Sequence, residues 1–421
     1  MKESLRFSGN LIFILFLGLL LFSFAMFQGG FTSWFLFYSF LPIFVYHLGL
    51  LFYPIKNWEV TRNLSHHVIR SGDGVTGTIR IRRSIPFPLY YCICEEILPD
   101  TLKKAGNHKD NYRNMAEPAK LNFSRDVKKI IFPSARRVME ISYKLDDVPR
   151  GDHHLQAIRV KTGDVFGFVK KEHIFDLRDQ LVAYPNERPI HLNEKVSSSE
   201  EGATASYTLN LKNTNVVSGI REYAPGDKFS WIDWKQTARK NKVMTKEFEQ
   251  EKSTDILVVL DSCASEGMNP LAFEASVEMT VSLMASTGKQ STQVGLLTIG
   301  EKVVYFPKHD SSLNDSVNQH LTRIQPTGSK PFPMKLKEEL FKVGHGNIVM
   351  LLTTRIDHGF KDSMQQLKKR SKKVIVLLIL PAEKISRNEH MLIQQLKSEG
   401  VDMRVLTEKE LMKTPIEVSR T

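Results

Sequence analysis

Two long apolar runs separated by a short turn open the chain. Residues 11–27 and 31–53 each come close to the ~20 residues that a helix needs to cross the hydrocarbon core of a bilayer, and neither run contains a Lys, Arg, Asp or Glu. A cleaved signal peptide would not be followed at once by a second long apolar run, and a buried core hairpin would carry a charged face. The pattern therefore predicts a transmembrane helical hairpin over residues 1–56.

Charged residues flank this hairpin on one side only. Lys2 and Arg6 precede the first run, Lys56, Arg62 and Arg70 follow the second, and the turn between the runs is uncharged. Because Lys and Arg concentrate in cytoplasmic loops, both ends of the hairpin are expected in the cytoplasm. We therefore expect a multi-pass protein of the cell membrane whose soluble domains lie in the cytoplasm.

The pattern changes to strands over residues 57–185. Apolar and polar residues alternate through 75–82, directly after the turn sequence Ser71-Gly72-Asp73-Gly74, which is typical of a half-buried strand. The polar, basic stretch 102–129 is expected to be a long loop. This segment predicts a β-sandwich-like domain. Its further strands are expected at residues 90–97, 138–145 and 155–160.

Residues 186–254 are predicted to form a polar linker and a charged segment, after which strands and helices alternate over residues 255–421. The apolar run 256–260 is continuous, as in strands that are buried on both faces of a parallel sheet. This order predicts a doubly wound α/β domain. Its further strands are expected at residues 294–299, 348–352 and 374–380, with helices at 271–287, 312–324, 359–371 and 385–398.

The formal net charge of +12 is compatible with a nucleic acid, an anionic membrane or an acidic protein as partner. No nucleic-acid recognition motif accompanies the charge, and the predicted anchor places the chain beside lipid, so we expect no nucleic acid partner. The three cysteines, Cys92, Cys94 and Cys263, are too few for a disulfide framework. We expect them to be small buried apolar side chains.

The densest run of charged and aromatic residues lies between positions 219 and 251. Its Pro225-Gly226-Asp227 step predicts a tight turn, and basic residues are interleaved with acidic ones along it. Such a run either forms ion pairs that fix the local fold or presents a charged surface to a partner. A catalytic role is disfavoured because no nucleophile or base pair is evident. The candidate signature and partner-binding residues are Gly219, Arg221, Tyr223, Gly226, Asp227, Asp233, Trp234, Lys235, Arg239 and Glu249.

A second candidate site lies at the end of the first buried strand of the α/β region, in Asp261-Ser262-Cys263-Ala264-Ser265. Ligands of doubly wound sheets bind at the carboxyl ends of the strands. An aspartate with nearby hydroxyl groups offers the hard oxygen ligands that Mg²⁺ prefers. The neutral thiol of Cys263 is a poor ligand for that ion.

The 219–251 signature, followed by the apolar strand and Asp261, resembles the domain-of-unknown-function 58 family. Arg150-Gly151, Asp164-Val165-Phe166-Gly167 and Val182-Ala183-Tyr184-Pro185 resemble its upstream β-region, and the two apolar runs match its common layout. The resemblance covers nearly the whole chain. It implies a von Willebrand factor A-like fold for the C-terminal half and no enzymatic activity. It also implies partnership with an AAA+ ATPase of the MoxR type or with a membrane transglutaminase-like protein.

The resemblance further implies a metal-ion-dependent adhesion site. By position, Asp261, Ser265 and Thr327 match its ligands for an ion such as Mg²⁺. The set is altered in two places: Cys263 replaces a hydroxyl residue, and Thr353-Thr354-Arg355 stands where an aspartate is expected. These departures leave open whether the site binds a metal or is a structural turn.

The sequence therefore predicts a membrane-anchored cytoplasmic interaction protein, an adaptor that works with a MoxR-type AAA+ ATPase in cell-envelope processes. Two alternatives remain open. One is a membrane-bound metal-dependent hydrolase that uses Asp227, Asp233 or Asp261, and the other is a structural scaffold such as a homo-oligomer. The oligomeric state does not follow from the sequence.

Overall fold

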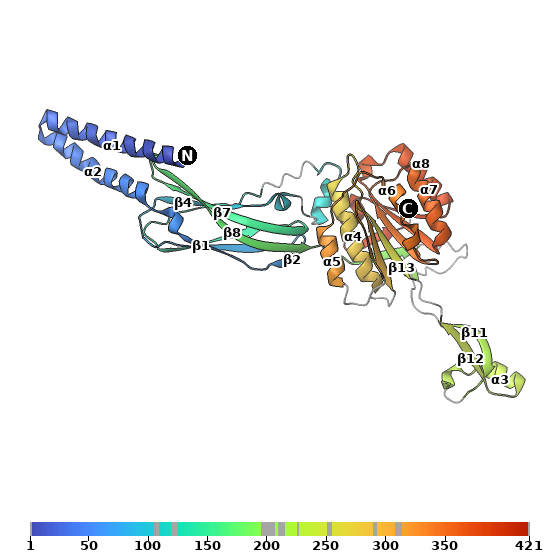
Figure 1. The fold of residues 1–421 in the computed structure, drawn as a ribbon. Helices are drawn as coiled ribbons and strands as arrows, with labels where there is room; N and C mark the ends of the chain where they lie inside the picture. Colours follow the sequence, from blue (N-terminus) through green and yellow to red (C-terminus); the bar gives the residue numbers. More distant parts are fainter. Residues whose placement is uncertain are drawn as a thin grey trace. The chain divides into compact units, whose positions relative to one another are not determined.

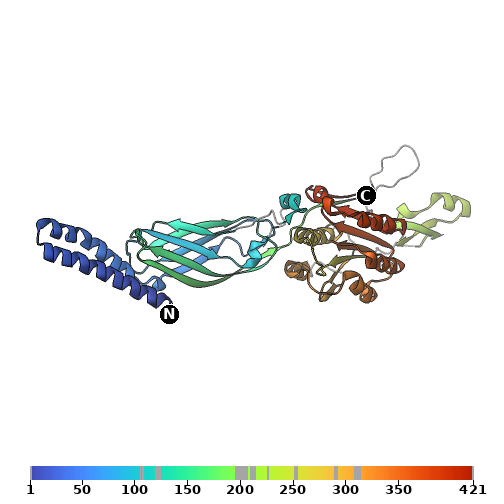
Figure 2. The same cartoon turned by 90° about the horizontal axis from the view of Figure 1, so that it is seen from above.

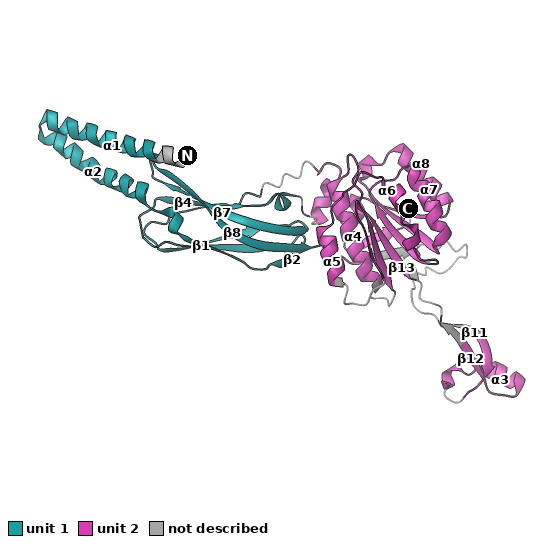
Figure 3. Cartoon of the chain, viewed as in Figure 1, with its two compact units in different colours: residues 1–106, 122–184 teal, residues 107–121, 185–421 magenta. Residues whose placement is uncertain are grey.

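A computed structural model describes residues 2–104, 106, 109–118, 125–194, 207–208, 215–224, 227–250, 255–288, 293–307 and 314–419. The chain divides into two compact units, residues 1–106 with 122–184 and residues 107–121 with 185–421 (Figure 3). It therefore enters the second unit briefly, returns to the first, and enters the second again at Pro185. The architecture is mixed α/β, with two apolar helices at the N-terminus and several sheets, as the sequence predicted.

The first unit begins with two helices, α1 (Lys2–Gln28) and α2 (Phe31–Phe52), which lie side by side (Figure 1, Figure 2). Gly29 makes the turn between them with a φ of 62°, a conformation that favours glycine. The segments Ser8–Gln28 and Phe31–Phe52 have hydropathies of 2.5 and 1.8, so both are long and apolar enough to cross a membrane. Many of their large apolar side chains are exposed, and helices that are apolar all round need an apolar environment.

Two sheets follow the helices and share one apolar core. Their strands are β1 (Glu59–Leu64), β2 (Val68–Arg70), β3 (Val75–Arg82), β4 (Tyr91–Ile97), β5 (Lys128–Ile131), β6 (Val138–Leu145), β7 (Gly151–Gly163) and β8 (Lys170–Tyr184). One sheet has the order β1-β3-β6 and the other β2-β8-β7-β4-β5. Every second side chain of β6 is buried, as expected for a strand with one face on the core. Cys92 and Cys94 lie in this core as free thiols.

The polar stretch that the sequence predicts as a long loop contributes to the core of the second unit. It includes the short helices η2 (Asp100–Lys103) and η3 (Lys109–Asn114). Tyr112 and Met115 are fully buried, and both belong to the second unit. The sequence did not predict this packing, because two buried side chains form no apolar pattern within a polar, basic stretch.

The second unit is built around a six-stranded sheet and its helices. These elements are β13 (Ile256–Asp261), α4 (Pro270–Gly288), β14 (Val294–Ile299), β15 (Val303–Phe306), α5 (Asn314–Arg323), α6 (Phe332–Glu338), η7 (Leu340–Lys342), β16 (Ile348–Thr353), α7 (His358–Arg370), β17 (Lys373–Ile379), η8 (Ala382–Lys384), α8 (Arg387–Ser398) and β18 (Asp402–Leu406). The strand order is β15-β14-β13-β16-β17-β18, and all neighbours run parallel except the edge strand β15. Because α4 and α5 cover one face and α6, α7 and α8 the other, the apolar strands are buried on both sides (Figure 1).

Two smaller sheets belong to the same unit. Their elements are β9 (Ile190–Glu194), β10 (Tyr207–Thr208), β11 (Asn215–Glu222), η5 (Phe229–Trp231), α3 (Trp234–Lys240), β12 (Met244–Gln250), α9 (Glu408–Leu411) and β19 (Ile416–Ser419). β9 pairs with β10 and with β19, and β11 pairs with β12 to form a hairpin that carries η5 and α3 between its strands. The predicted linker thus contains strands, while its serine-rich part, residues 197–202, lies outside the described residues.

Candidate functional site

A cleft of about 260 Å³ lies at the carboxyl edge of the six-stranded sheet. Asp261 ends β13, and Thr353 ends the neighbouring strand β16. The loops that follow these strands and the segment before α6 form its walls. The lining residues are Asp261, Cys263, Ala264, Ser265, Glu266, Met268, Ser329, Pro331, Phe332, Pro333, Thr354, Arg355 and Asp357.

Both oxygens of the Asp261 carboxyl group are hydrogen-bonded within the chain. The N–H of Cys263 donates to Oδ1 at 3.0 Å, and the hydroxyl of Thr353 lies 2.7 Å from Oδ2. Burial raises the pKa of Asp261 to about 7, against the effect of these hydrogen bonds, and the charge of Asp357 adds to the rise. The surroundings of Asp261 therefore favour its protonated form more than water does.

The structure brings part of the predicted ligand set into this cleft. Ser265 lines the cleft together with Asp261. Thr327 is engaged beside it: its N–H donates to the carbonyl of Ser262 at 3.0 Å, and its hydroxyl accepts from the N–H of Glu301 at 3.4 Å. The Thr327 hydroxyl thus stabilises a turn between two loops.

Asp357 is a cleft residue that the sequence reasoning missed. It is the N-cap of α7, and its Oδ1 accepts the N–H of Phe360 at 2.8 Å. An aspartate immediately before a helical pattern is a recognisable start signal, so the cap could have been found in the sequence. Its place in the cleft depends on the course of the loop after β16, which no local pattern reveals.

The side chains at the cleft do not provide the ligands of a Mg²⁺ site. Mg²⁺ needs hard oxygen ligands in near-octahedral geometry. Cys263 presents a thiol that donates to the carbonyl of Ile299 at 3.4 Å, and Thr353, which is hydrogen-bonded to Asp261, stands where a carboxylate is expected. Among the described residues, no group of three or more His, Cys, Asp or Glu side chains could bind an ion. We therefore assign no step to a metal.

The charged signature segment forms the hairpin β11–β12. Arg221 and Asp227 make a bidentate pair, with Nη1–Oδ2 at 2.8 Å and Nη2–Oδ1 at 2.6 Å. The hydrogen bond from Arg221 keeps the pKa of Asp227 below its usual value. Asp233 caps α3 by accepting two N–H groups of its first turn, both at 3.1 Å. Carboxylates used in this way stabilise the hairpin itself.

The same hairpin exposes aromatic and basic side chains. Phe229 and Trp234 are 77% and 69% exposed, and Tyr223 stacks on Phe229 with ring centres 6.3 Å apart. Lys235 and Arg239 are exposed and lie one helical turn apart on α3. These residues together are called the hairpin surface below.

The three remaining signature residues, Gly219, Gly226 and Glu249, are either placed by their backbone alone or lie outside the described residues. Gly219 sits at an irregularity in the pairing of β11 with β12. Gly226 lies outside the described residues. For Glu249 only the backbone is described, and it pairs with Val216.

Replacing Asp227 with alanine should loosen the end of the hairpin that carries η5 and α3. The reason is that the Arg221 guanidinium and the N–H of Ala224 both lose the carboxylate that accepts their hydrogen bonds. We expect faster hydrogen–deuterium exchange there and unchanged exchange in the six-stranded sheet. Glu222→Ala is the control, since it removes an exposed partner of Lys242, and such pairs contribute little. Equal exchange in wild type and Asp227→Ala would contradict a structural role for Asp227.

Comparison with known proteins adds the following. A family model described as "Protein of unknown function DUF58" matches residues 219–401, a range that contains the cleft and the hairpin from within β11 onward. The "Uncharacterized protein YeaD" of Bacillus subtilis (strain 168) is 31% identical over 403 residues, which cover 94% of this chain and 95% of that protein.

Two solved structures show much weaker likeness. Spo0M, a sporulation control protein from Bacillus subtilis, is 14% identical with a TM-score of 0.15, over 30% of this chain and 50% of that one. Cwp6 from Clostridium difficile is 10% identical with a TM-score of 0.17, over 82% of this chain and 49% of that one. This chain therefore spans about half the length of each, and neither likeness carries an argument.

Proposed function

This chain belongs to the DUF58 family of proteins of unknown function, and from that premise we propose that it is a membrane-anchored interaction protein whose hairpin surface binds an acidic protein partner. Helices α1 and α2 supply the anchor. The soluble units lie in the cytoplasm, since Lys2 and Arg6 precede the apolar segment Ser8–Gln28 and Lys56 follows α2. The partner is a MoxR-type AAA+ ATPase, and the two act together in a cell-envelope process.

One observation carries the binding role, namely the exposed aromatic and basic residues of the hairpin. The acidic side chains Asp227 and Asp233 are engaged within the hairpin, whereas Trp234, Lys235 and Arg239 face solvent. Aromatic and arginine side chains are enriched where proteins bind one another, and a basic patch attracts an acidic partner. The hairpin therefore suits a protein ligand better than a small substrate.

We further propose that the α/β part of the second unit is a doubly wound, von Willebrand factor A-like domain. The strand order with one antiparallel edge strand, and the helices on both faces, support this identification. Asp261 and Ser265 would then lie on the edge that such a domain presents to a partner, with Thr327 beside them.

The test is binding of the full-length protein, in detergent or nanodiscs, to a purified MoxR-type ATPase from the same organism. Lys235→Glu combined with Arg239→Glu reverses the charge of the hairpin surface and should weaken binding about tenfold or more. The matched control is Lys369→Glu combined with Lys384→Glu, which makes the same change in charge at exposed positions of α7 and η8 and should leave binding unchanged.

The outcomes separate the partner from the binding role. Equal binding by both double variants would remove the hairpin surface from the interface. If capture from solubilised membranes recovers a different protein that only the hairpin variant loses, the binding role stands and the ATPase is the wrong partner. If no protein is captured specifically, the interaction role itself fails.

A further inference from the structure

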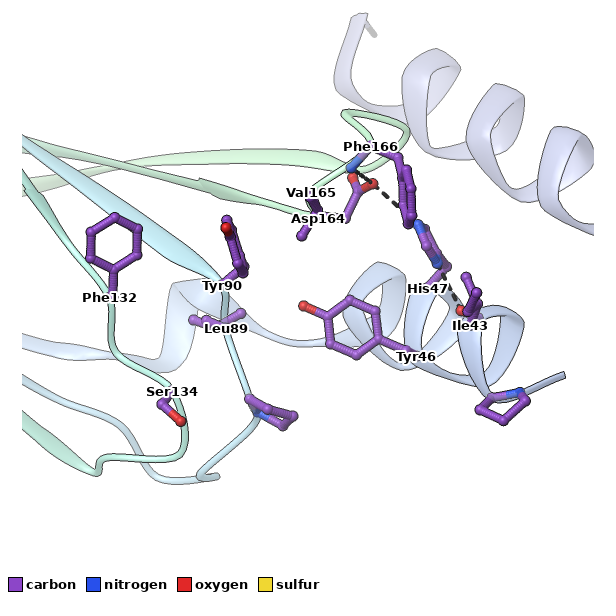
Figure 4. Close-up of a pocket in the computed structure, with 12 residues that line it drawn as sticks. Ile43, Tyr46, His47, Leu89, Tyr90, Phe132, Ser134, Asp164, Val165 and Phe166 are labelled. Carbon is purple, nitrogen blue, oxygen red and sulfur yellow. Dashed lines mark hydrogen bonds and ion pairs between the residues drawn. The ribbon is translucent and has the colours of Figure 1, made fainter. Parts of the chain in front are cut away.

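The Asp164-Val165-Phe166-Gly167 motif, which the hairpin function does not use, joins the β-sheets to α2 within the first unit. The Asp164 carboxylate accepts the N–H groups of Phe166 at 2.9 Å, Phe168 at 3.3 Å and Val169 at 2.6 Å. Its Oδ2 also lies 3.1 Å from His47 Nε2 (Figure 4). Burial would raise the pKa of Asp164, but these hydrogen bonds outweigh it and lower the pKa, so the group is a carboxylate.

His47 is hydrogen-bonded on both sides of its ring. Its Nδ1 lies 2.7 Å from the carbonyl oxygen of Ile43, and its Nε2 faces the carboxylate of Asp164. The pair is buried, with side-chain exposures of 5% and 0%. It fixes the loop between β7 and β8 against α2, at a position inside the segment that can cross a membrane.

A cavity of about 620 Å³ opens beside His47 and Asp164. Ile43 and Tyr46 of α2 line it on one side, and Tyr90 and Phe132 from strand ends line it on the other (Figure 4). Phe166 also lines it and lies beside His47, with ring centres 6.0 Å apart. Apart from His47 and Asp164 its lining is mainly apolar. Its volume falls in the range of ~300–1,000 Å³ that is typical of small-ligand sites.

Apolar side chains are exposed around this cavity, and we call them the aromatic end of the first unit. They are Tyr90, Phe132, Val165, Phe166 and Phe168, with exposed fractions of 54%, 67%, 60%, 63% and 43%. Phe168 also contacts Phe13 of α1, with ring centres 5.5 Å apart. A cluster of this kind on a water-soluble surface would be costly, and it normally marks an interaction site.

The length of the part of α2 that is not packed on the sheets indicates what covers the aromatic end. From His47 onward α2 is packed on the sheets, since Leu50 and Leu51 lie in the shared core. The free part, residues 31–42, is about 18 Å long at ~1.5 Å per residue. A bilayer's hydrocarbon core is about 30 Å thick. If α2 crosses that core, the cavity and the aromatic end must lie at the depth of the lipid chains.

We propose that this cavity is a lipid site that takes one acyl chain of a membrane phospholipid. At that depth the mainly apolar lining of the cavity faces lipid acyl chains. Lys170, directly after the loop between β7 and β8, is exposed and would supply a cationic side chain to the phosphate headgroup. The inference rests on the proposed membrane anchor, and it adds a specific ligand to it.

The test uses the full-length protein in nanodiscs that contain phosphatidylglycerol with a photoreactive diazirine in one acyl chain. After irradiation, labelled residues are mapped by mass spectrometry. We expect label on the cavity wall at Tyr90 or Phe132. Val165→Trp fills the cavity and displaces several methylene groups, so it should lower this label about tenfold. Ile174→Trp, a similar change at an exposed position of β8 outside the cavity, should not.

Two internal readouts keep the outcomes distinct. Label on Leu19, an exposed residue of α1, reports membrane insertion, and protection of Cys92 and Cys94 from alkylation reports folding of the sheets. Label at Leu19 without label at the cavity, or cavity label that survives Val165→Trp in a folded protein, overturns the lipid site alone. Absence of label at Leu19 as well overturns the membrane anchor. Phe132→Trp is a second filling variant if Val165→Trp does not fold.

Discussion

Replacing Glu278 with glutamine should lower the free energy of unfolding of the second unit by about 3–5 kcal/mol, because it leaves a buried arginine without its counter-charge. Glu278 lies on α4, and its side chain is 1% exposed. The partner is Arg188, which precedes β9 and is 8% exposed. Tyr112 contacts this pair, so loss of the pair should destabilise the segment around Tyr112 as well as α4.

The geometry of this pair explains the size of the expected effect. Arg188 donates from Nε to Glu278 Oε1 at 2.6 Å and from Nη2 to Oε2 at 3.2 Å, and a third bond goes to the carbonyl of Leu411 at 2.7 Å. The hydroxyl of Tyr112 donates to Glu278 Oε2, and the Arg188 guanidinium lies 5.6 Å from the Tyr112 ring centre. Burial raises the pKa of Glu278, and Arg188 and Tyr112 oppose that rise.

The buried cysteines allow this prediction to be measured in each unit separately. Cys263 reports on the second unit, and Cys92 and Cys94 report on the first. Alkylation in increasing urea should give a lower midpoint for Cys263 in Glu278→Gln, with the midpoints of the other two unchanged. The control Glu383→Gln removes an exposed carboxylate of η8 and should leave all midpoints unchanged. An unchanged Cys263 midpoint in Glu278→Gln would show that the buried pair contributes no net stability.

The parts of this fold that were predictable from the sequence are those whose signal is local. The uncharged apolar runs predicted α1 and α2, and the continuous run at β13 predicted a strand buried on both faces. Membership of the DUF58 family, predicted from the 219–251 signature and the residues after it, is confirmed by the family match and by the related protein from Bacillus subtilis.

The features that escaped prediction depend on partners far apart in the chain. Arg188 and Glu278 are 90 residues apart, and His47 and Asp164 are 117 apart. Arg188 therefore appeared to belong to a polar linker, and Tyr112, which joins the same pair, appeared to belong to a loop. No periodicity within a short window reveals such pairs, because burial of a charge only becomes favourable once its partner is in place.

The candidate cleft was only partly predictable, because one of its contacts also joins residues far apart in the chain. Asp261 and Ser265 follow directly from a strand end in a parallel sheet. The hydrogen bond from Thr353 to Asp261 depends on β13 and β16 being neighbours, across 92 residues of chain. That contact changes the chemistry expected of the aspartate. The resemblance suggested a metal-binding carboxylate, whereas the structure shows a buried, hydrogen-bonded group with a raised pKa.

This raised pKa predicts that Asp261→Asn stabilises the second unit at high pH and not at low pH. The folded-state pKa of about 7 lies above the ordinary value, so the folded protein binds the proton more tightly than the unfolded chain. The contribution of Asp261 to stability is therefore fully present below about pH 4 and is lost as the pH rises to about 7. Asparagine does not titrate, and it can accept the Cys263 N–H while donating to the Thr353 hydroxyl.

The difference in unfolding free energy between Asp261→Asn and wild type should therefore grow by roughly 2–4 kcal/mol between about pH 5 and pH 8, as measured by pulse proteolysis in urea. Asp362→Asn, at an exposed position of α7, should show no such growth. A difference that stays constant with pH would show that Asp261 is ionised throughout. The same series with added Mg²⁺ tests the cleft directly, because an ion bound by the Asp261 carboxylate would stabilise wild type at pH 8 and not the asparagine variant. Because Cys263 and Thr353 stand where oxygen ligands of the ion are expected, we expect Mg²⁺ to change neither protein.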